Sequence, residues 1–243
     1  MNEKWTQYLM DKCGVAWFKC DEDSGNVLDS KGTAIGTPYN ITRVDDGLGG
    51  KALSFNGTSS YVQFNGKVIP IGKKSIFFRI KRNGIPSKTY EHIITNVSQG
   101  TGQYGIQISI TNLEGGYLYV TSTKNGWEGL FQGLRTPPSI NIFDNQWHDI
   151  LFTWEGVIGV GNAKLYVDDM TTPVDVSNTI SAETNTPTEN LTLGVSTANI
   201  STKLAIFEGQ LDNIQIYNDV IDPNIPIHLI HDNNVIKTIK DSQ

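Results

Sequence analysis

The chain has 243 residues and a formal net charge of -6, and only 18% of its residues are charged. Its Lys and Arg residues are scattered, so no basic stripe is present that could neutralise a nucleic-acid backbone. No stretch approaches the roughly 20 apolar residues of a membrane-spanning helix, and the N-terminal segment lacks the pattern of a secretory signal. We therefore expect neither nucleic-acid binding nor insertion into a membrane. The sequence does not distinguish a cytoplasmic protein from a domain of an exported polypeptide or a structural protein of a virus.

After a short N-terminal segment that is compatible with a helix, the sequence reads as a series of short strands. Each is apolar or alternates apolar and polar residues, and turn-forming residues separate it from the next. The predicted strands lie at residues 14–20, 51–55, 61–64, 75–84, 92–97, 104–111, 116–123, 146–156, 163–170, 190–196 and 203–218. About a dozen short strands without helical periodicity predict an all-β sandwich or barrel with under about 10% helix. Trp17, Trp147 and Trp154 fall in these strands and are expected in the core.

Two segments depart from this pattern. Residues 125–145 are rich in Gly, Pro and aromatic residues and form the longest predicted loop. The tail, residues 223–243, contains proline residues and is expected to run as an extended strap along the sandwich. We therefore expect one domain over residues 1–243, with its core at about 15–222.

Four segments carry a resemblance to a known family. They are VAWFKCDEDSGNVLDSKG, GLGGKALSFNGTSSYVQF, QWHDILFTWEG with AKLYVDD, and FEGQLDNIQIYN. In this order the chain is similar to the laminin G-like jelly-roll domains of the concanavalin A-like lectin/glucanase superfamily, of bacterial or phage type. The resemblance implies a two-sheet antiparallel jelly-roll β-sandwich in which the first and last strands are adjacent. The sequence departs from the family pattern at Asp169, where a Gly is usual, and at residues 125–145.

The resemblance does not by itself settle whether the chain is an enzyme. Glucanases of this fold place carboxylates on alternate residues of one strand, facing a groove. No Glu-x-Asp-x-Glu pattern is present, and the acidic residues 21–23 run directly into Ser-Gly-Asn, which indicates a turn. The histidines His92, His148, His228 and His231 are dispersed, and no Gly-x-Ser-x-Gly motif occurs. We expect no enzyme activity, with a glycoside hydrolase as an alternative.

The sequence therefore predicts a non-catalytic binding module with carbohydrate, such as a cell-surface glycan, as its leading ligand. The alternative is a structural or adhesion protein of a phage tail or bacterial surface, whose sandwich binds another protein.

Trp127 is the leading candidate for the ligand platform. It lies in KNGWEGLFQG, a polar and Gly-rich context in which periodicity cannot bury it, and an exposed aromatic ring can stack on a pyranose. Tyr104 and Arg135 are its expected polar neighbours. The alternative is that Trp127 packs with Phe131 and folds the loop back on itself.

The acidic turn also predicts a structural calcium ion. Calcium takes about six to eight oxygen ligands, and the resemblance places the first strand beside the last, so Asp212 can approach the turn. The expected ligands are Asp21, Asp23, Asn26, Asn56, the carbonyl of Gly57, and Asp212. The alternative is that the turn is solvated and Asp212 only caps a strand.

Overall fold

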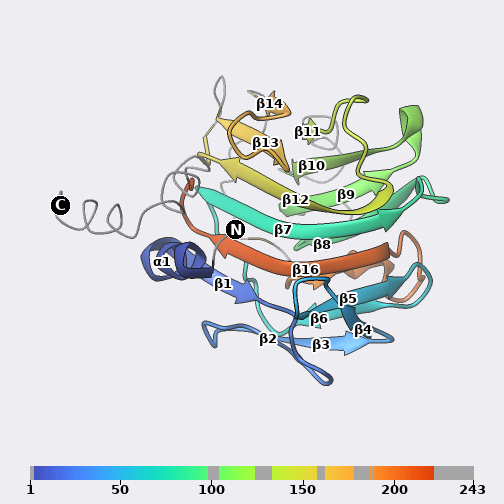
Figure 1. Cartoon of the computed structure of the whole chain (residues 1–243), viewed down its shortest axis with the longest axis horizontal. Helices are drawn as coiled ribbons and strands as arrows, with labels where there is room; N and C mark the ends of the chain where they lie inside the picture. The colour runs from blue at the N-terminus through green and yellow to red at the C-terminus, as the bar shows by residue number, and fades with distance from the viewer. Residues whose placement is uncertain are drawn as a thin grey trace.

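Two antiparallel sheets pack face to face in the computed structural model of the chain, which describes residues 3–97, 104–123, 133–157, 162–177, 187 and 189–221 (Figure 1). Within these residues each sheet has eight strands. The helices there are α1, Glu3–Cys13, and two single 3-10 turns, Leu113–Gly115 and Thr197–Asn199. None of the helices in these ranges is long and apolar enough to cross a membrane. The predicted jelly-roll β-sandwich is confirmed.

The strand order brings the two ends of the described chain together. In the first sheet the order is β14, β13, β12, β7, β16, β5, β4, and β1 shares one edge of β16 with β5. Its strands are β1 Gly14–Phe18, β4 Thr42–Asp45, β5 Lys51–Asn56, β7 Lys74–Asn83, β12 Asp144–Trp154, β13 Ala163–Val167, β14 Asp175–Ser177 and β16 Glu208–Tyr217. Because β1 pairs with β16, the predicted contact between the first and last strands is confirmed.

The second sheet closes the other side of the core. Its order is β11, β10, β9, β8, β15, β6, β3, β2. Its strands are β2 Val27–Leu28, β3 Ile35–Tyr39, β6 Tyr61–Phe64, β8 Tyr90–Thr95, β9 Gly105–Thr111, β10 Tyr117–Thr123, β11 Gly133–Arg135 and β15 Thr192–Leu193.

Strand β7 illustrates how the alternation of residues builds the core. Ile76, Phe78 and Ile80 are fully buried in the cluster between the sheets. Because successive side chains of a strand point to opposite faces, Phe77 and Arg79 point to the outer face of the first sheet. Those two residues are buried as well, so other parts of the chain shield the outer face of the first sheet at these two positions.

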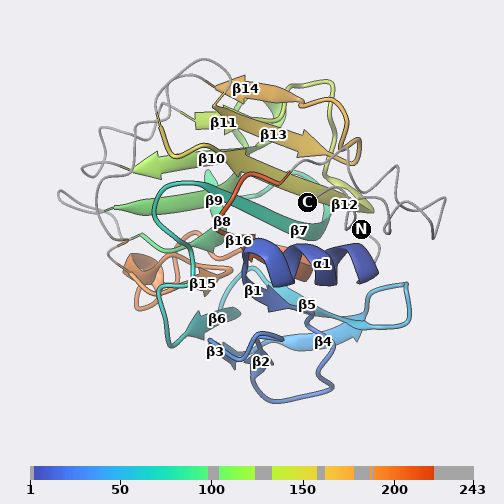
Figure 2. The same cartoon turned by 90° about the vertical axis from the view of Figure 1, so that its left-hand side faces the viewer.

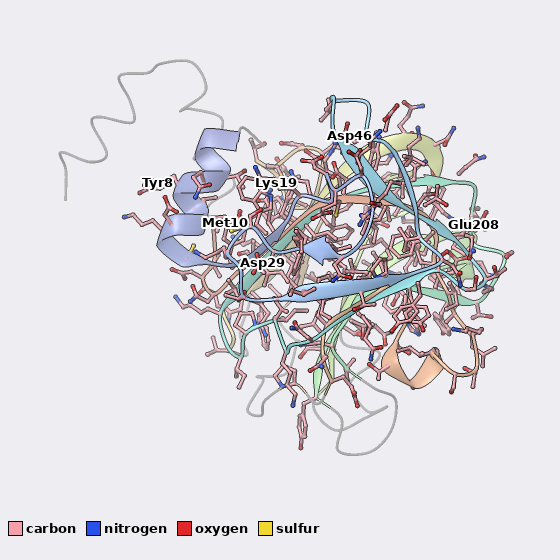
Figure 3. All side chains as sticks on the ribbon, turned by 90° about the horizontal axis from the view of Figure 1, so that it is seen from below. Tyr8, Met10, Lys19, Asp29, Asp46 and Glu208 are labelled. Atoms are coloured by element: carbon pink, nitrogen blue, oxygen red, sulfur yellow. The ribbon has the colours of Figure 1, made fainter. Side chains whose placement is uncertain are left out.

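Helix α1 covers one part of this outer face (Figures 1 and 2). Met10 packs with Trp17 of β1, Phe77 of β7 and Tyr217 of β16 in a second apolar cluster. In Figure 3 the helix, with Tyr8 and Met10 labelled, stands at one end of the molecule. The N-terminal segment, which the sequence left compatible with a helix, forms α1, and its tertiary packing stabilises it.

A bulge in β16 divides the outer face. Asn213 has a φ of 49°, a left-handed conformation that Asn adopts more readily than most residues, and the pairing with β7 shifts between Asp212 and Gln215. As a result both Leu211 and Ile214 point into the core, while Asp212 points outward.

Two expectations for the tryptophans differ from the structure. Trp154 lies in the core as predicted, but Trp147 is only half-buried, because it shares the outward face of β12 with Asp149. Trp17 is buried under α1 instead of between the sheets.

The predicted loop at 125–145 is also partly wrong. It contains β11, which hydrogen-bonds to β10, and β12 begins within it at Asp144. Residues 125–132 and the tail at 223–243 lie outside the described residues.

Replacing Met10 with Ala tests the docking of α1. Met10 is 1% exposed, so the truncation leaves a cavity under the helix and is expected to lower the free energy of unfolding by about 2–5 kcal/mol. Urea denaturation measures the change. The control Gln7→Ala, at an exposed position of the same helix, is expected to stay within about 0.5 kcal/mol of the wild type. Equal small effects at both positions would contradict the docked helix.

Candidate functional site

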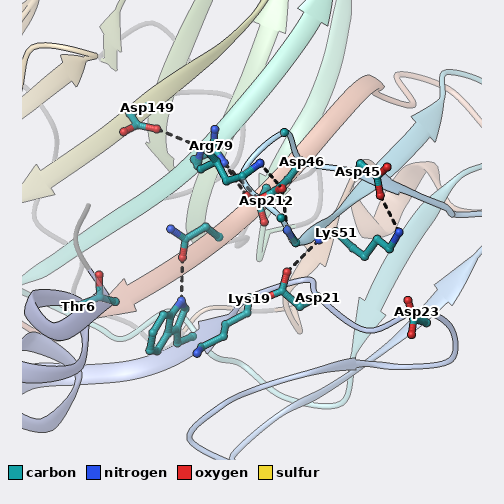
Figure 4. Close-up of a pocket in the computed structure, with 16 residues that line it drawn as sticks. Thr6, Lys19, Asp21, Asp23, Asp45, Asp46, Lys51, Arg79, Asp149 and Asp212 are labelled. Atoms are coloured by element: carbon teal, nitrogen blue, oxygen red, sulfur yellow. Dashed lines mark hydrogen bonds and ion pairs between the residues drawn. The ribbon is translucent and has the colours of Figure 1, made fainter.

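An open cavity of about 1050 Å³ lies on the outer face of the first sheet, beside α1 (Figure 4). Residues of β7, β12 and β16 form its floor, the loop between β4 and β5 forms one wall, and β1 with the segment that follows it forms the other. We call this space the acidic cavity, because six carboxylate and three basic side chains line it.

Arg79 lies at the centre of the floor and contacts three carboxylates. Its Nη1 is 3.0 Å from Oδ2 of Asp212 and 3.7 Å from Oδ2 of Asp46, and its Nε is 3.5 Å from Oδ1 of Asp149. Asp212 and Asp149 stand directly opposite Arg79 on the two strands that flank β7. Strand register therefore creates this ion network.

The network compensates its buried charges only in part. Burial raises the pKa of Asp212 to about 7, and the charge of Asp46 adds to the rise, although Arg79 opposes it. Burial likewise raises the pKa of Asp149, again against the influence of Arg79. Burial therefore still disfavours the ionised form of both carboxyl groups, even beside Arg79.

The sequence Asp-Asp-Gly-Leu-Gly-Gly shapes the wall between β4 and β5. Oδ1 of Asp46 accepts hydrogen bonds from the backbone N–H groups of Leu48, at 2.7 Å, and Gly50, at 2.9 Å. Gly49 has a φ of 100°, which residues with a Cβ rarely adopt, and a Cβ at Gly50 would collide with Oδ1 of Asp21. Asp21 in turn accepts the N–H of Lys51, so this loop is held at both of its sides.

One aromatic ring, that of Trp17, lines the acidic cavity, and a second, that of Trp147, does not line it but packs against Arg79 of the floor. The guanidinium of Arg79 lies 4.8 Å from the ring centroid of Trp147, which remains half-buried. Trp17 lines the cavity, and its Nε1 donates a hydrogen bond to Oδ1 of Asn213 at 2.8 Å. The Asn213 bulge therefore holds one of the aromatic rings in place.

The structure brings half of the predicted calcium ligands to this cavity. Asp21, Asp23 and Asp212 all line it, although Asp212 is engaged by Arg79. Asn26 is exposed and does not line the cavity.

The other two predicted ligands lie elsewhere. Asn56 stands opposite Glu208, four residues along β16 from Asp212, which corresponds to about 13 Å. Figure 3 shows Glu208 at the end of the molecule away from α1. Oδ1 of Asn56 already accepts three backbone N–H bonds, and the carbonyl of Gly57 accepts a hydrogen bond from Nζ of Lys88. The six residues therefore do not surround one point.

Two of the three residues predicted for the ligand platform, Tyr104 and Arg135, lie at the second sheet. Trp127 lies outside the described residues. Tyr104 directly precedes β9. Arg135 of β11 pairs with Tyr119 of β10, which in turn pairs with Ser109 of β9. Tyr104 and Ser109 are five residues apart in the chain, so about 17 Å of β9 separates Tyr104 from the position of Arg135. Arg135 contacts Glu114 at 2.8 Å instead. Tyr104 and Arg135 therefore do not contact each other, and the platform around Trp127 stays a prediction.

Sequence reasoning missed Asp46, Arg79, Asp149 and the role of Trp147. One signal was present: Arg79 interrupts the apolar run IFFRI at residues 76–80, and a buried arginine requires counter-charges. The partners themselves come from distant strands, so their identity depends on register.

The family model described as concanavalin A-like lectin/glucanases superfamily matches residues 56–224. The chain belongs to this superfamily. No curated protein matches its sequence.

Solved structures of known proteins share the fold of this superfamily member. Domain 4 of AbnA, a GH43 extracellular arabinanase from Geobacillus stearothermophilus solved with arabinotriose, has a TM-score of 0.64 and 17% identity, covering 87% of this chain and 95% of that one. The receptor binding domain of botulinum neurotoxin D has a TM-score of 0.64 and 13% identity, covering 89% of this chain and 52% of that one. The chain thus spans about half the length of the neurotoxin domain. A Trypanosoma rangeli sialidase has a TM-score of 0.59 and 12% identity, covering 87% and 31%.

Replacing Arg79 with Met tests the ion network. The change leaves Asp46, Asp149 and Asp212 without their shared cation and is expected to lower the free energy of unfolding by about 3–5 kcal/mol at neutral pH. Because the pKa of Asp212 is raised in the folded state, lowering the pH favours the folded form and should reduce this loss. Chemical denaturation at two pH values measures both effects.

The matched control for that experiment is Lys73→Met. Lys73 forms exposed ion pairs with Glu155 and Asp219, which are expected to contribute at most about 1 kcal/mol. An Arg79→Met loss as small as that of the control would contradict the importance of the network.

The calcium ion stays a prediction. Among the residues that the structure describes, no three acidic, histidine or cysteine side chains form a group that could hold a metal ion. If calcium binds the folded chain, millimolar calcium raises the melting temperature and a chelator lowers it. A melting temperature that neither reagent moves contradicts the prediction.

Proposed function

We propose that this member of the superfamily is a non-catalytic carbohydrate-binding module, and that the sugar binds in the acidic cavity. The observation that carries the proposal is a half-buried indole ring, Trp147, at the edge of the cavity, where it packs against Arg79 on the sheet face that also carries Asp149 and Asp212. Sugars present apolar C–H faces and adjacent hydroxyl groups. An aromatic ring can stack on such a face, while carboxylates accept and a guanidinium donates hydrogen bonds to hydroxyl groups.

The structural neighbours support a sugar as the ligand. The arabinanase domain was solved in complex with arabinotriose, and the binding domain of botulinum neurotoxin DC in complex with SialylT. These are properties of those proteins, and the low identities carry only the fold to this chain. The cavity is the feature of this chain that fits the same class of ligand.

The arrangement of the carboxylates favours binding over hydrolysis. Asp149 and Asp212 lie on the strands either side of β7, so their backbones are about 10 Å apart, and their carboxyl groups are closer because both contact Arg79. Inverting glycosidases hold two carboxyl groups about 6.5–9.5 Å apart with a water between them. The raised pKa of Asp212, about 7, would suit a general acid. Here, however, Arg79 contacts both groups and fills the space that the water and the glycosidic bond need.

The described histidines are also committed to structural contacts. Burial lowers the pKa of His92 to about 4, and its Nδ1 is 2.9 Å from Oγ of Ser109 inside the protein. His148 is held between Asp144, at 3.0 Å, and Asp168, at 2.8 Å. Neither side chain lines the acidic cavity. His228 and His231 lie outside the described residues.

Replacing Trp147 with Ala tests the proposal. A glycan array with the wild-type protein first identifies a ligand, and titration calorimetry with the strongest hit measures its Kd. Trp147→Ala is expected to weaken binding by about thirtyfold or more, as for the central aromatic residue of a binding site. The melting temperature of the variant checks that it folds.

Two further variants test whether the loss of binding is specific to Trp147. Tyr90→Ala removes an exposed aromatic ring of the second sheet and is expected to leave the Kd unchanged. Trp127→Ala examines the platform predicted from the sequence, and a large loss there with none at Trp147 would place the ligand on the platform. An array without hits would favour the structural or adhesion protein, and turnover that a single carboxylate change abolishes would establish a hydrolase.

A further inference from the structure

We infer that the acidic cavity selects uncharged glycans and rejects sugars that carry a carboxylate, an inference that rests on the proposed function and adds the ligand class. Six aspartates and only three basic residues line the cavity. Aspartates line both the floor and the two walls, so every part of the cavity that a sugar can contact has carboxylates nearby.

The basic residues of the cavity are already committed. Arg79 contacts Asp46, Asp149 and Asp212, and it is only 9% exposed. Proteins recognise a carboxylate on a ligand best with the open fork of an arginine, which forms two parallel hydrogen bonds. A guanidinium shared among three aspartates has no such fork to offer.

The lysines do not change this balance. Nζ of Lys51 is 2.7 Å from Oδ1 of Asp45. Nζ of Lys19 lies 4.3 Å from the ring centroid of Trp17. Two further aspartates, Asp21 and Asp23, are exposed at the border of the cavity and extend the negative potential toward solvent.

Neutral sugars meet no such repulsion. Their hydroxyl groups donate hydrogen bonds to ionised carboxylates, which accept only, and the surplus of aspartates then becomes a set of acceptors. Burial raises the pKa values of Asp149 and Asp212, and a hydrogen bond donated by a sugar hydroxyl group would stabilise their ionised forms.

The test is an array of matched glycan pairs, in which each neutral glycan is printed beside its sialylated or uronic-acid form. A chelator is present throughout, so that no divalent cation can bridge a sugar carboxylate to an aspartate. Hits are expected among the neutral members, with the acidic partners at least about tenfold weaker in titration. Acidic members that bind as well or better overturn the inference and leave the proposed function standing. An array without hits of either kind overturns the proposed function itself.

A variant pair identifies charge as the cause. Asp23→Asn alone, and together with Asp21→Asn, keeps side chains of the same shape, and the Asn at position 21 can still accept the N–H of Lys51. Both variants are expected to narrow the neutral-to-acidic ratio of affinities by severalfold, and added salt should narrow it in the wild type, since these carboxylates are exposed. The control Glu155→Gln removes a negative charge about 20 Å along β12 from Asp149 and should leave the ratio unchanged. An unchanged ratio in the two test variants overturns the inference.

Discussion

Arg79 is a cation in the middle of a strand whose neighbouring residues are buried on both faces, and the first sheet is arranged around it. Burying a guanidinium without counter-charges costs several kcal/mol. The flanking strands meet this requirement with Asp149 and Asp212, and the loop between β4 and β5 adds Asp46. The network also specifies register. A slip of one residue in β12 or β16 would turn a carboxylate into the apolar core and Arg79 would lose a partner.

The same strands serve two environments on their outer face. On β7, Phe77 lies under α1 while Arg79, two residues later, lies in the acidic cavity. On β12, which runs antiparallel to β7, Leu151 lies in the cluster under α1 and Asp149 lies in the acidic cavity. The Asn213 bulge lies between the part of β16 under α1 and the part that lines the acidic cavity. It shifts the pairing of β16 with β7, and its side chain accepts a hydrogen bond from Trp17. Docking of α1 and the shape of the cavity are therefore linked through shared strands.

The sequence was sufficient for the fold because period-2 alternation and turn residues are local signals, and β7 and β12 lie within one or two residues of their predicted positions. It also placed Asp21 and Asp212 near each other, since the family resemblance made the first and last strands adjacent. It could not give the partners of Arg79. Which residues of β12 and β16 oppose Arg79 depends on cross-strand register and on a bulge, and neither leaves a local pattern. Trp147 is a different case: it stands an odd number of residues from Ile150, Phe152 and Trp154, so strand alternation already places it on the face opposite the core.

Carboxylates gathered in a partly buried place repel one another, and Arg79 supplies a positive charge among Asp46, Asp149 and Asp212. A cation that belongs to the chain has a consequence for recognition. The ion pairs already hold the guanidinium and its three carboxylate partners in place, so binding a ligand to them costs little side-chain conformational entropy. Compensation is nevertheless incomplete, because burial holds the pKa of Asp212 at about 7 even beside Arg79. A donated hydrogen bond stabilises the ionised form of such a carboxyl group and lowers its pKa. In the proposed complex the sugar hydroxyl is that donor, and the incomplete neutralisation of the cavity then contributes to binding.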